Sequence, residues 1–214
     1  MKKYELTTEC KEFLGRKLYR IKALTFFSDV KEGDLGGWIE KEENLSQEGN
    51  TWVYGNATVY DNATVYGNAM VYGNAMVYGN AMVYGNARVY DNATVYDNAR
   101  VCGNAMVYGN VRVHGNAMVY GNAMVYGNAE IKKKTHLLEI GFIGSRDDVT
   151  TFFRTKDEEI FVKCGCFKGN IDEFEKQVQE VHGDDKHGRV YALAIAMARE
   201  QIELDDEDVE EEDD

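Results

Sequence analysis

Four basic side chains interrupt a repetitive stretch of the sequence and are the first candidates for chemistry. Arg88, Arg100 and Arg112 follow one another at intervals of 12 residues, and His114 stands where neighbouring units carry tyrosine. Arginine forms bidentate hydrogen bonds with phosphate or carboxylate. Histidine acts as a general base when a partner group positions it within hydrogen-bond distance of its target. The hexad of His114 contains no carboxylate, so we favour neutral drift at an outward position over a general base.

A cysteine pair, Cys164 and Cys166, is the second candidate. One glycine separates the two, and in a strand this spacing places both thiols on one face. The pair is two ligands short of a zinc site, with only His182 and His187 nearby, and it lacks the C-x-x-C spacing of redox pairs. We therefore predict two small buried hydrophobic side chains, and we expect no metal and no cofactor.

A six-residue repeat must position the arginines and the histidine. Valine recurs every sixth residue from Val53 and Ile131 continues the series, which gives thirteen uninterrupted hexads over residues 53–130. Counting valine as the first place, Gly or Asp holds the third, Asn the fourth, and Ala the fifth except at Val111. Each hexad predicts a short strand followed by a Gly-Asn turn, since both residue types tolerate positive φ.

The side-chain pattern distinguishes a coil from a series of hairpins. Hairpins with two-residue turns would mix Ala and Val with Met and Tyr on each face, and no consistent core would form. In a coil that always turns the same way, Ala and Val point inward from every strand. Tyrosine and the sixth-place residue then point outward. The pattern therefore predicts a mainly β fold built as a coil of parallel strands.

An aliphatic residue followed four places later by a small one, every six residues, resembles the bacterial transferase hexapeptide repeat. The resemblance implies a left-handed parallel β-helix with three hexads per coil. Residues 20–54 resemble the N-terminal cap of a hexapeptide-repeat group from bacterial genomes and prophages, and residues 144–182 resemble a module of phage-type proteins. The resemblance thus implies a phage or prophage protein that acts in the cytoplasm of a bacterial host, with counter-defence as one role.

Four segments are expected along the chain. They are an N-terminal cap at 1–46, a β-helix of hexapeptide repeats at 47–131, a small α+β module at 132–203, and a disordered acidic tail at 204–214. The module should contain three strands and two helices. Asn170 and Glu173 predict a capping box for the first helix. Apolar residues at helical spacing predict the buried faces of the two helices: Ile171, Phe174, Val178 and Val181, then Val190, Leu193, Ala194 and Met197.

The net charge of −13 is concentrated at the C-terminus. Residues 203–214 hold ten acidic residues and no basic one, so the rest of the chain has a charge of only −3 (−13 + 10). No dense basic patch is evident in the sequence, which disfavours direct nucleic-acid binding. The sequence contains no run of 18 apolar residues, so we predict no membrane-spanning helix. Four cysteines form no disulfide framework in a chain of this length, which favours a reducing cytoplasm.

One face of the predicted coil is unusually aromatic. With three hexads per coil, residues 18 apart share a wall, and so much exposed aromatic and thioether surface is typical of an interface. We therefore predict a homo-oligomer, most simply a trimer, although recent duplication would also explain the uniform letters. The interface residues are Tyr54, Tyr72, Tyr90, Tyr108 and Tyr126, with Met70, Met106 and Met124 beside them.

These patterns favour a non-catalytic, oligomeric binding protein. Its partner would be a host protein or a small anionic, nucleotide-like ligand, held by Arg88, Arg100, Arg112 and His114 in a groove between subunits. Two alternatives remain open. One is an acyltransferase with an acyl-thioester cofactor, since the resemblance implies a catalytic histidine near a subunit interface, but no inserted loop interrupts residues 53–130. The other is a purely structural oligomer.

Overall fold

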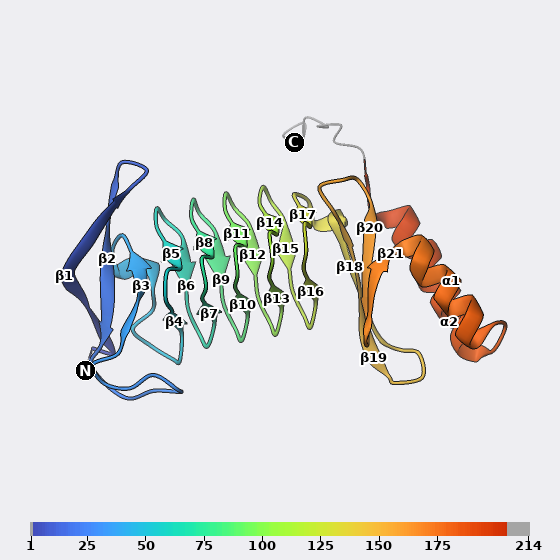
Figure 1. The fold of residues 1–214 in the computed structure, drawn as a ribbon, viewed down its shortest axis with the longest axis horizontal. Helices are drawn as coiled ribbons and strands as arrows, with labels where there is room; N and C mark the ends of the chain where they lie inside the picture. The colour runs from blue at the N-terminus through green and yellow to red at the C-terminus, as the bar shows by residue number, and fades with distance from the viewer. Residues whose placement is uncertain (1, 205–214) are drawn as a thin grey trace, which may run out of the picture.

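The computed structural model describes residues 2–204 and shows an elongated molecule with three consecutive parts (Figure 1). A coil of short parallel strands forms the middle. An antiparallel hairpin covers one end, and a sheet with two helices covers the other. The fold is a parallel β-solenoid with an α+β module, which confirms the predicted fold class, while the left-handed turn stays a prediction. No helix within residues 2–204 is long and apolar enough to cross a membrane.

Strands 18 residues apart pair in parallel register, so the solenoid has three walls. The first wall contains β3 (Leu35–Ile39), β5 (Thr58–Val59), β8 (Met76–Val77), β11 (Thr94–Val95), β14 (Arg112–Val113) and β17 (Glu130–Ile131). The second contains β4 (Trp52–Val53), β7 (Met70–Val71), β10 (Arg88–Val89), β13 (Met106–Val107) and β16 (Met124–Val125). The third contains β6 (Thr64–Val65), β9 (Met82–Val83), β12 (Arg100–Val101) and β15 (Met118–Val119).

Valine and alanine fill the interior of the coil. Val89 is fully buried and lies between Val71 and Val107 of the neighbouring coils, and the same stacking repeats from Val53 to Ile131. The fifth-place alanines are also buried, because only a small side chain fits at a corner of so narrow a coil. The inward and outward assignment made from the repeat is confirmed.

The turns of the coil differ from the prediction in which residue adopts positive φ. Positive φ falls on the third place of the hexad, at glycines and at Asp61, Asp91 and Asp97, and no Asn in residues 2–204 has it. The expectation that Asn shares this conformation is therefore wrong. The fourth-place asparagines instead stack as amide ladders, in which Asn74 donates to Asn92 and Asn92 donates to Asn110, each at 3.2 Å.

The N-terminal cap extends the first wall with antiparallel strands. β2 (Arg16–Ala23) pairs with β3, and β1 (Tyr4–Phe13) pairs with β2, so the open edge of the coil is covered. Trp52 of the first coil is 1% exposed, with its ring 6.0 Å from that of Tyr4 and 5.4 Å from that of Phe27. The cap therefore closes the core and one outward face of the first coil.

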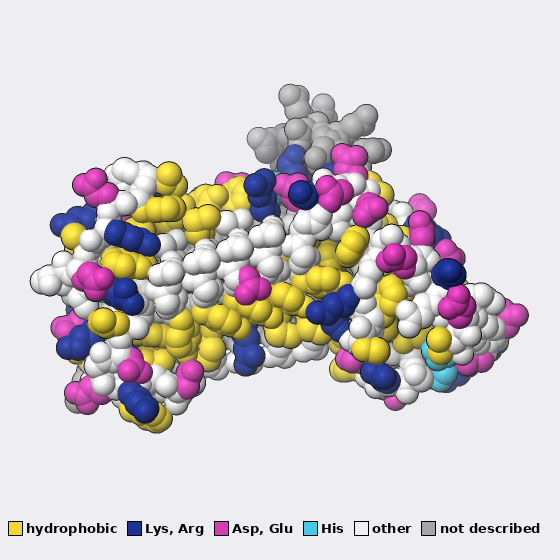
Figure 2. All heavy atoms as spheres, in the orientation of Figure 1, with side chains coloured by type: hydrophobic (Ala, Val, Ile, Leu, Met, Phe, Trp, Pro, Cys, Tyr) yellow, Lys and Arg dark blue, Asp and Glu magenta, His cyan; other side chains and the backbone are white. Residues whose placement is uncertain are grey.

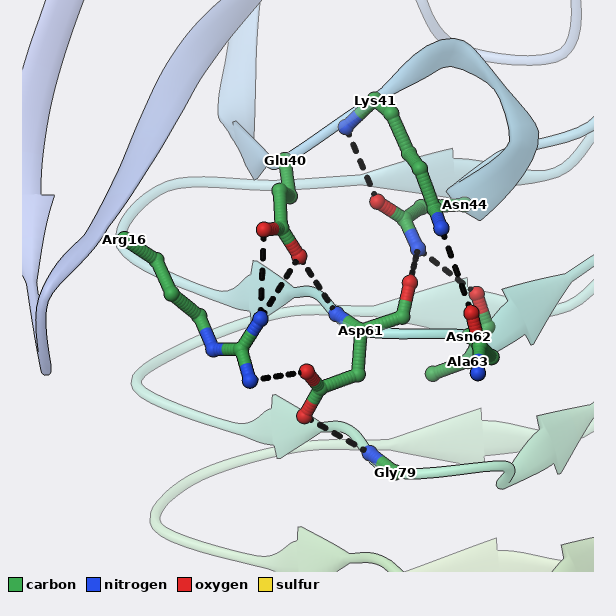
Figure 3. Close-up of polar contacts among 8 residues, drawn as sticks. All are labelled: Arg16, Glu40, Lys41, Asn44, Asp61, Asn62, Ala63 and Gly79. Atoms are coloured by element: carbon green, nitrogen blue, oxygen red, sulfur yellow. Dashed lines mark hydrogen bonds and ion pairs between the residues drawn. The ribbon is translucent and has the colours of Figure 1, made fainter.

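A polar network fixes the cap to the coil (Figure 3). Arg16 reaches the Glu40 carboxylate at 3.2 Å and also forms an ion pair with Asp61. Glu40 accepts a hydrogen bond from the backbone N–H of Asp61 at 2.7 Å, and the Asp61 carboxylate accepts one from the N–H of Gly79, one coil further, at 3.3 Å. Asp91 and Asp97 repeat this last contact with glycines one coil further at 3.2 Å.

The C-terminal module is a four-stranded antiparallel sheet covered by two helices (Figure 1). Its elements are β18 (Leu137–Ile143), β19 (Asp148–Arg154), β20 (Ile160–Cys164), β21 (Phe167–Asn170), α1 (Ile171–His182) and α2 (Lys186–Gln201), with the short helices η1 (Glu42–Asn44) and η2 (Lys134–His136) earlier in the chain. Phe153 packs on the solenoid core, while Phe152 packs beneath the helices. Three strands were expected, but a turn at Gly165 divides the last into two.

The helices confirm the predicted cap and correct the predicted faces. Asn170 and Glu173 form the capping box at the start of α1. However, Val181, Leu193 and Met197 are 66%, 71% and 53% exposed. Ala194 is buried as predicted, and the rest of the buried stripe of α2 passes through Tyr191, Ile195 and Ala198. In a layer of two helices, each helix buries only the sides that contact the sheet and the other helix. The sequence does not define how each helix is rotated about its own axis.

The coil should be far more sensitive to changes in its interior than in its ladders. Val89→Asp places an unpaired carboxylate in the core and should lower the free energy of unfolding by roughly 3–5 kcal/mol. Asn92→Ala removes two exposed amide hydrogen bonds and should lower it by about 1 kcal/mol. Denaturant unfolding of both variants measures the difference. Equal losses would contradict the inward assignment of Val89.

Candidate functional site

The three arginines lie on three different walls of the solenoid. Arg88 is in β10 of the second wall, Arg100 in β12 of the third and Arg112 in β14 of the first. All three are exposed. A spacing of 12 residues in a coil of 18 moves each arginine by two walls, so they do not meet within one chain.

Arg100 instead lines a groove together with a lysine triplet that follows the repeat and was not among the predicted site residues. The third wall ends at β15, whereas the other walls continue to β16 and β17, so the end of the solenoid has a step above β15. The chain leaves β17 across this step as Lys132, Lys133 and Lys134. The backbone of Lys132 passes so close to Gly115 that a Cβ on the glycine would lie 2.7 Å from the Lys132 carbonyl oxygen.

The step forms a groove of about 800 Å³, and we call it the basic groove, defined by Arg100, Lys132, Lys133 and Lys134. Its only acidic lining residue within the described chain is Glu203, whose carboxylate is 3.1 Å from the Lys133 ammonium. The remaining lining residues are neutral: Asn98, Gly115, Asn116, Ala117, Met118 and Thr135. Among the described residues, the lining therefore includes four basic side chains and one carboxylate.

The basic groove can be predicted from the sequence with the 18-residue period of the coil. Lys132 stands one coil beyond His114, so the triplet necessarily follows the turn that contains Gly115. The sequence shows no dense basic patch because the basic residues of the groove are not all adjacent along the chain. The coil places Arg100 next to lysines more than thirty positions away, because residues in successive coils are neighbours in space.

His114 has a carboxylate partner, contrary to expectation. Its Nε2 lies 3.3 Å from Oε1 of Glu130, and both side chains are largely shielded from solvent. Glu130 follows Arg112 by one coil in the first wall, so the same period predicts this neighbour as well. The histidine ring stacks on Tyr96, with centroids 4.8 Å apart and an interplanar angle of 1°.

Glu130 also contacts the C-terminal module. Its second oxygen is 4.0 Å from Nη1 of Arg154, a side chain that is 1% exposed. Arg154 donates from Nε and Nη2 to the carbonyl oxygen of Leu204 at 3.3 and 3.0 Å. The chain of contacts from His114 through Glu130 to Arg154 therefore joins the last coil to the module.

The tyrosine ladder of the second wall is stacked and half-buried. Ring centroids are 4.8 Å apart for Tyr72 and Tyr90, and 4.9 Å apart for Tyr90 and Tyr108, with nearly parallel planes. The sixth-place residues beside the ladder are Met70 and Met106, with Arg88 between them. Figure 2 shows the hydrophobic side chains as stripes along the solenoid, with charged side chains concentrated at its two ends.

Both ends of this ladder are engaged by the flanking parts. The Tyr54 hydroxyl donates to Asp29 of the cap at 2.7 Å. At the other end, the Tyr126 hydroxyl donates to the carbonyl oxygen of Val162 at 3.3 Å, and the Lys168 ammonium lies 5.0 Å from the Tyr126 ring centroid. The surface that remains for an oligomer interface is thus the middle of the wall.

The cysteine pair does not share a strand face. β20 ends at Cys164, the chain turns at Gly165 with φ of +53°, and Cys166 is exposed in the turn. Cys164 is half-buried and accepts a hydrogen bond from the Thr150 hydroxyl at 3.2 Å. The prediction of two buried thiols is therefore wrong for Cys166. No group of three or more metal-ligating side chains occurs in residues 2–204.

Comparisons with known proteins support a repetitive β-solenoid. A family model described as YdcK Beta solenoid repeat matches residues 53–67, 59–73, 65–78, 69–85, 75–89, 87–102, 99–115 and 117–130. A protein of Escherichia coli (strain K12) described as "Uncharacterized acetyltransferase YdcK" is 44% identical over 62 residues, which are 25% of this chain and 19% of that protein. The chain therefore covers about a fifth of the relative that it matches.

The stacked tyrosine side chains should ionise at a higher pH than free tyrosine. Burial, with a smaller contribution from neighbouring tyrosines, raises the pKa of Tyr90 and Tyr126 from 10.0 to about 12. Because the folded pKa lies above the unfolded one, the stabilising contribution is complete below pH 10 and is lost as pH rises through 12. We expect an absorbance titration of the native protein to retain a phenol fraction that ionises near pH 12. In denaturant, all phenols should ionise near pH 10, and a native midpoint of 10 throughout would contradict the burial of these phenols.

Proposed function

We propose that this β-solenoid is a non-catalytic binding protein for a small anionic, nucleotide-like ligand, and that the basic groove is its site. The gathering of Arg100, Lys132, Lys133 and Lys134 at one step of the solenoid carries this proposal. A concave surface lined by one sign of charge concentrates the electrostatic field and attracts the opposite charge. Arginine and lysine are the residues that bind phosphate through charge-assisted hydrogen bonds.

The asparagines of the groove support a phosphate-bearing ligand. Asn98 and Asn116 line it beside the cations, and Asn98 donates its amide to Asn116 at 3.4 Å. Amide groups in line with the cations offer donors to ester or hydroxyl oxygens of a ligand, while Met118 supplies an apolar surface for a ring. The groove thus combines charge for phosphate with a flat apolar contact for a base or sugar.

An acyltransferase is the second candidate function. The pair formed by His114 and Glu130 favours it, since a carboxylate that orients a histidine is the arrangement of a general base. The printed name of the E. coli relative points the same way. Against it, the His114 ring is stacked on Tyr96, and Glu130 also contacts the buried Arg154, so the pair already has a structural role. Turnover of an acyl-thioester that His114→Tyr abolishes would favour the enzyme.

The biological setting proposed from the resemblance is a bacterial host cell infected or lysogenised by a phage. A binding protein that sequesters a nucleotide-like signal or a host protein would act there as counter-defence. A rigid repeat with a basic groove suits sequestration, because a preformed site binds its ligand without a conformational change. The phage origin and this role stay predictions.

Binding of inorganic triphosphate, with ATP as a nucleotide arm, tests the proposed site. The variant Arg100→Ala/Lys132→Ala/Lys134→Ala should raise the Kd about tenfold in calorimetric titration, since each exposed charge pair contributes up to about 1 kcal/mol. His114→Tyr, which restores the letter of the repeat, should leave the Kd unchanged. Arg88→Ala/Arg112→Ala should also be silent, and loss of binding in that variant would instead indicate a groove between subunits.

We further propose that the protein is a homotrimer that associates through the second wall. The half-buried Tyr72, Tyr90 and Met106 leave a flat aromatic and thioether surface there, and such a composition is typical of interface cores. Tyr72→Ser/Tyr108→Ser should shift the mass measured by sedimentation toward 24.2 kDa, the mass of one chain, before it lowers the melting temperature. A native protein that sediments as a monomer at micromolar concentration would rule the trimer out.

A further inference from the structure

A second cavity lies in the C-terminal module and shares no lining residue with the basic groove. The strand order places the turn between β18 and β19 at the same end of the sheet as the turn between β20 and β21. These turns, 144–147 and 165–166, enclose the cavity together with one face of α1. We call it the module pocket. All its lining residues belong to 2–204, whereas residues 205–214 of the predicted acidic tail lie outside the described residues.

A chain of hydrogen bonds in the module pocket ends in an unused donor. The hydroxyl of the fully buried Thr150 donates to Cys164 Sγ at 3.2 Å, and the Cys164 thiol donates to the hydroxyl oxygen of Tyr191 at 3.5 Å. Each of the three groups carries one proton. Within residues 2–204 no further group accepts the proton of Tyr191. Tyr191 is 7% exposed and lines the pocket, so an acceptor atom of a ligand would satisfy this buried donor.

The Tyr191 side chain is held in place at both ends. Its ring meets that of Phe174 edge to face, with centroids 5.4 Å apart and planes at 82°. Its hydroxyl lies so close to the turn after β18 that a side chain at Gly144 would overlap it. Burial, followed by the hydrogen bond with Cys164, raises the pKa of Tyr191, so the hydroxyl keeps its proton at neutral pH.

Two opposite charges stand at the mouth of the module pocket. Arg146 lies in the turn before β19 and Asp148 begins β19, and both are exposed lining residues. In the described chain, Arg146 forms no hydrogen bond or ion pair, and the Asp148 carboxylate accepts only from the N–H of Val149 at 2.7 Å. Both charges act on the pKa of Tyr191, since the Asp148 carboxylate raises it and the Arg146 guanidinium lowers it. The guanidinium, the carboxylate and the phenol are therefore near one another.

Apolar side chains and a small volume limit the rest of a ligand. Phe167 and Phe174, whose ring centroids are 5.0 Å apart, line the pocket with Val178. Val181 also lines it and is 66% exposed, so a ligand would cover an apolar side chain that the fold leaves open. The volume is about 190 Å³. Because a dry cavity of about 150 Å³ admits benzene, a ligand of about nine non-hydrogen atoms fits here.

We propose that the module pocket binds a free α-amino acid with an apolar side chain of about the size of leucine. Its carboxylate accepts hydrogen bonds from the Tyr191 hydroxyl and the Arg146 guanidinium, and its ammonium pairs with Asp148. Its side chain packs against Phe174 and Val178. A carboxylate alone is repelled by Asp148 and an amine alone by Arg146, so a molecule with both charges matches the mouth best. This inference does not depend on the proposed function of the basic groove.

Saturation-transfer NMR of small molecules with the full chain tests the ligand class. L-Leucine should receive saturation mainly on its methyl protons and bind with a Kd below about 1 mM. The comparison molecules are 4-methylpentanoate, which lacks the ammonium, and 3-methylbutylamine, which lacks the carboxylate. Each should bind about tenfold more weakly, since it leaves one charge of the mouth unpaired. No saturation of L-leucine at 10 mM, or equal affinity for all three molecules, would overturn the proposal.

Variants of the mouth and of the buried donor test the residues. Tyr191→Phe keeps the ring and removes the hydroxyl, and Arg146→Gln removes an exposed cation without disturbing the core. Each should raise the Kd of L-leucine about tenfold and leave triphosphate binding unchanged. Lys176→Gln, at an exposed lysine of α1 outside the pocket, is the matched control and should be silent. An unchanged Kd in Arg146→Gln would contradict the proposed mode of binding.

Alkylation of cysteine tests the location. Cys164 lines the module pocket and is half-buried, whereas Cys10 is exposed in the N-terminal cap. Saturating L-leucine should slow the reaction of Cys164 with N-ethylmaleimide several-fold and leave the rate at Cys10 unchanged, as measured by mass spectrometry of the peptides. Protection of neither cysteine, or equal protection of both, would show that L-leucine does not occupy the pocket.

Discussion

From β4 to β17, strands of neighbouring coils pair at an offset of eighteen residues, and the contacts between these coils depend on that number. In the hexads of residues 53–112 the backbone N–H groups of the second, fourth and sixth places donate to carbonyl oxygens of the next coil, as Tyr72 does to Val89 at 3.0 Å. One extra residue would end this pairing and turn every following side chain to the wrong face. The constraint is consistent with the uninterrupted hexads of residues 53–130.

The same constraint governs the outward surface. Side chains 18 apart are superimposed at about the spacing of neighbouring strands, ~4.8 Å, which suits ring stacking and amide ladders. Tyr90 therefore stacks on Tyr72 and Tyr108, and Asn92 bonds to the asparagines of the adjacent coils. A residue type that is repeated on the outer surface thus stabilises the coil itself, whether or not that surface also binds a partner. Uniformity of the surface is by itself weak support for an interface.

The proposed binding site lies at the C-terminal end of the solenoid, where the regular repeat stops. The repeat places the same residue types on each wall, whereas the step above β15 is concave and lined by four basic side chains. An open solenoid end needs a cover, and the C-terminal module provides it by packing Phe153 on the core. The cover joins at the first two walls, through β16 and β17, and leaves the third partly open. A site at this junction has both the rigidity of the coil and a shape that the coil alone lacks.

The sequence alone determined the parallel coil, its buried Val and Ala, and the wall of each arginine, because a strict period converts sequence positions directly into positions in space. It did not determine where the module's helices turn their apolar faces, since the exposed Leu193 depends on which sides the sheet covers. The 18-residue period already implies that Glu130 and Lys132 lie one coil beyond Arg112 and His114, but only the tertiary structure shows the Glu130 carboxylate against His114 and the groove that Lys132 shares with Arg100. Both contacts arise between successive coils and at the end of the repeat, where three-dimensional adjacency replaces adjacency along the chain.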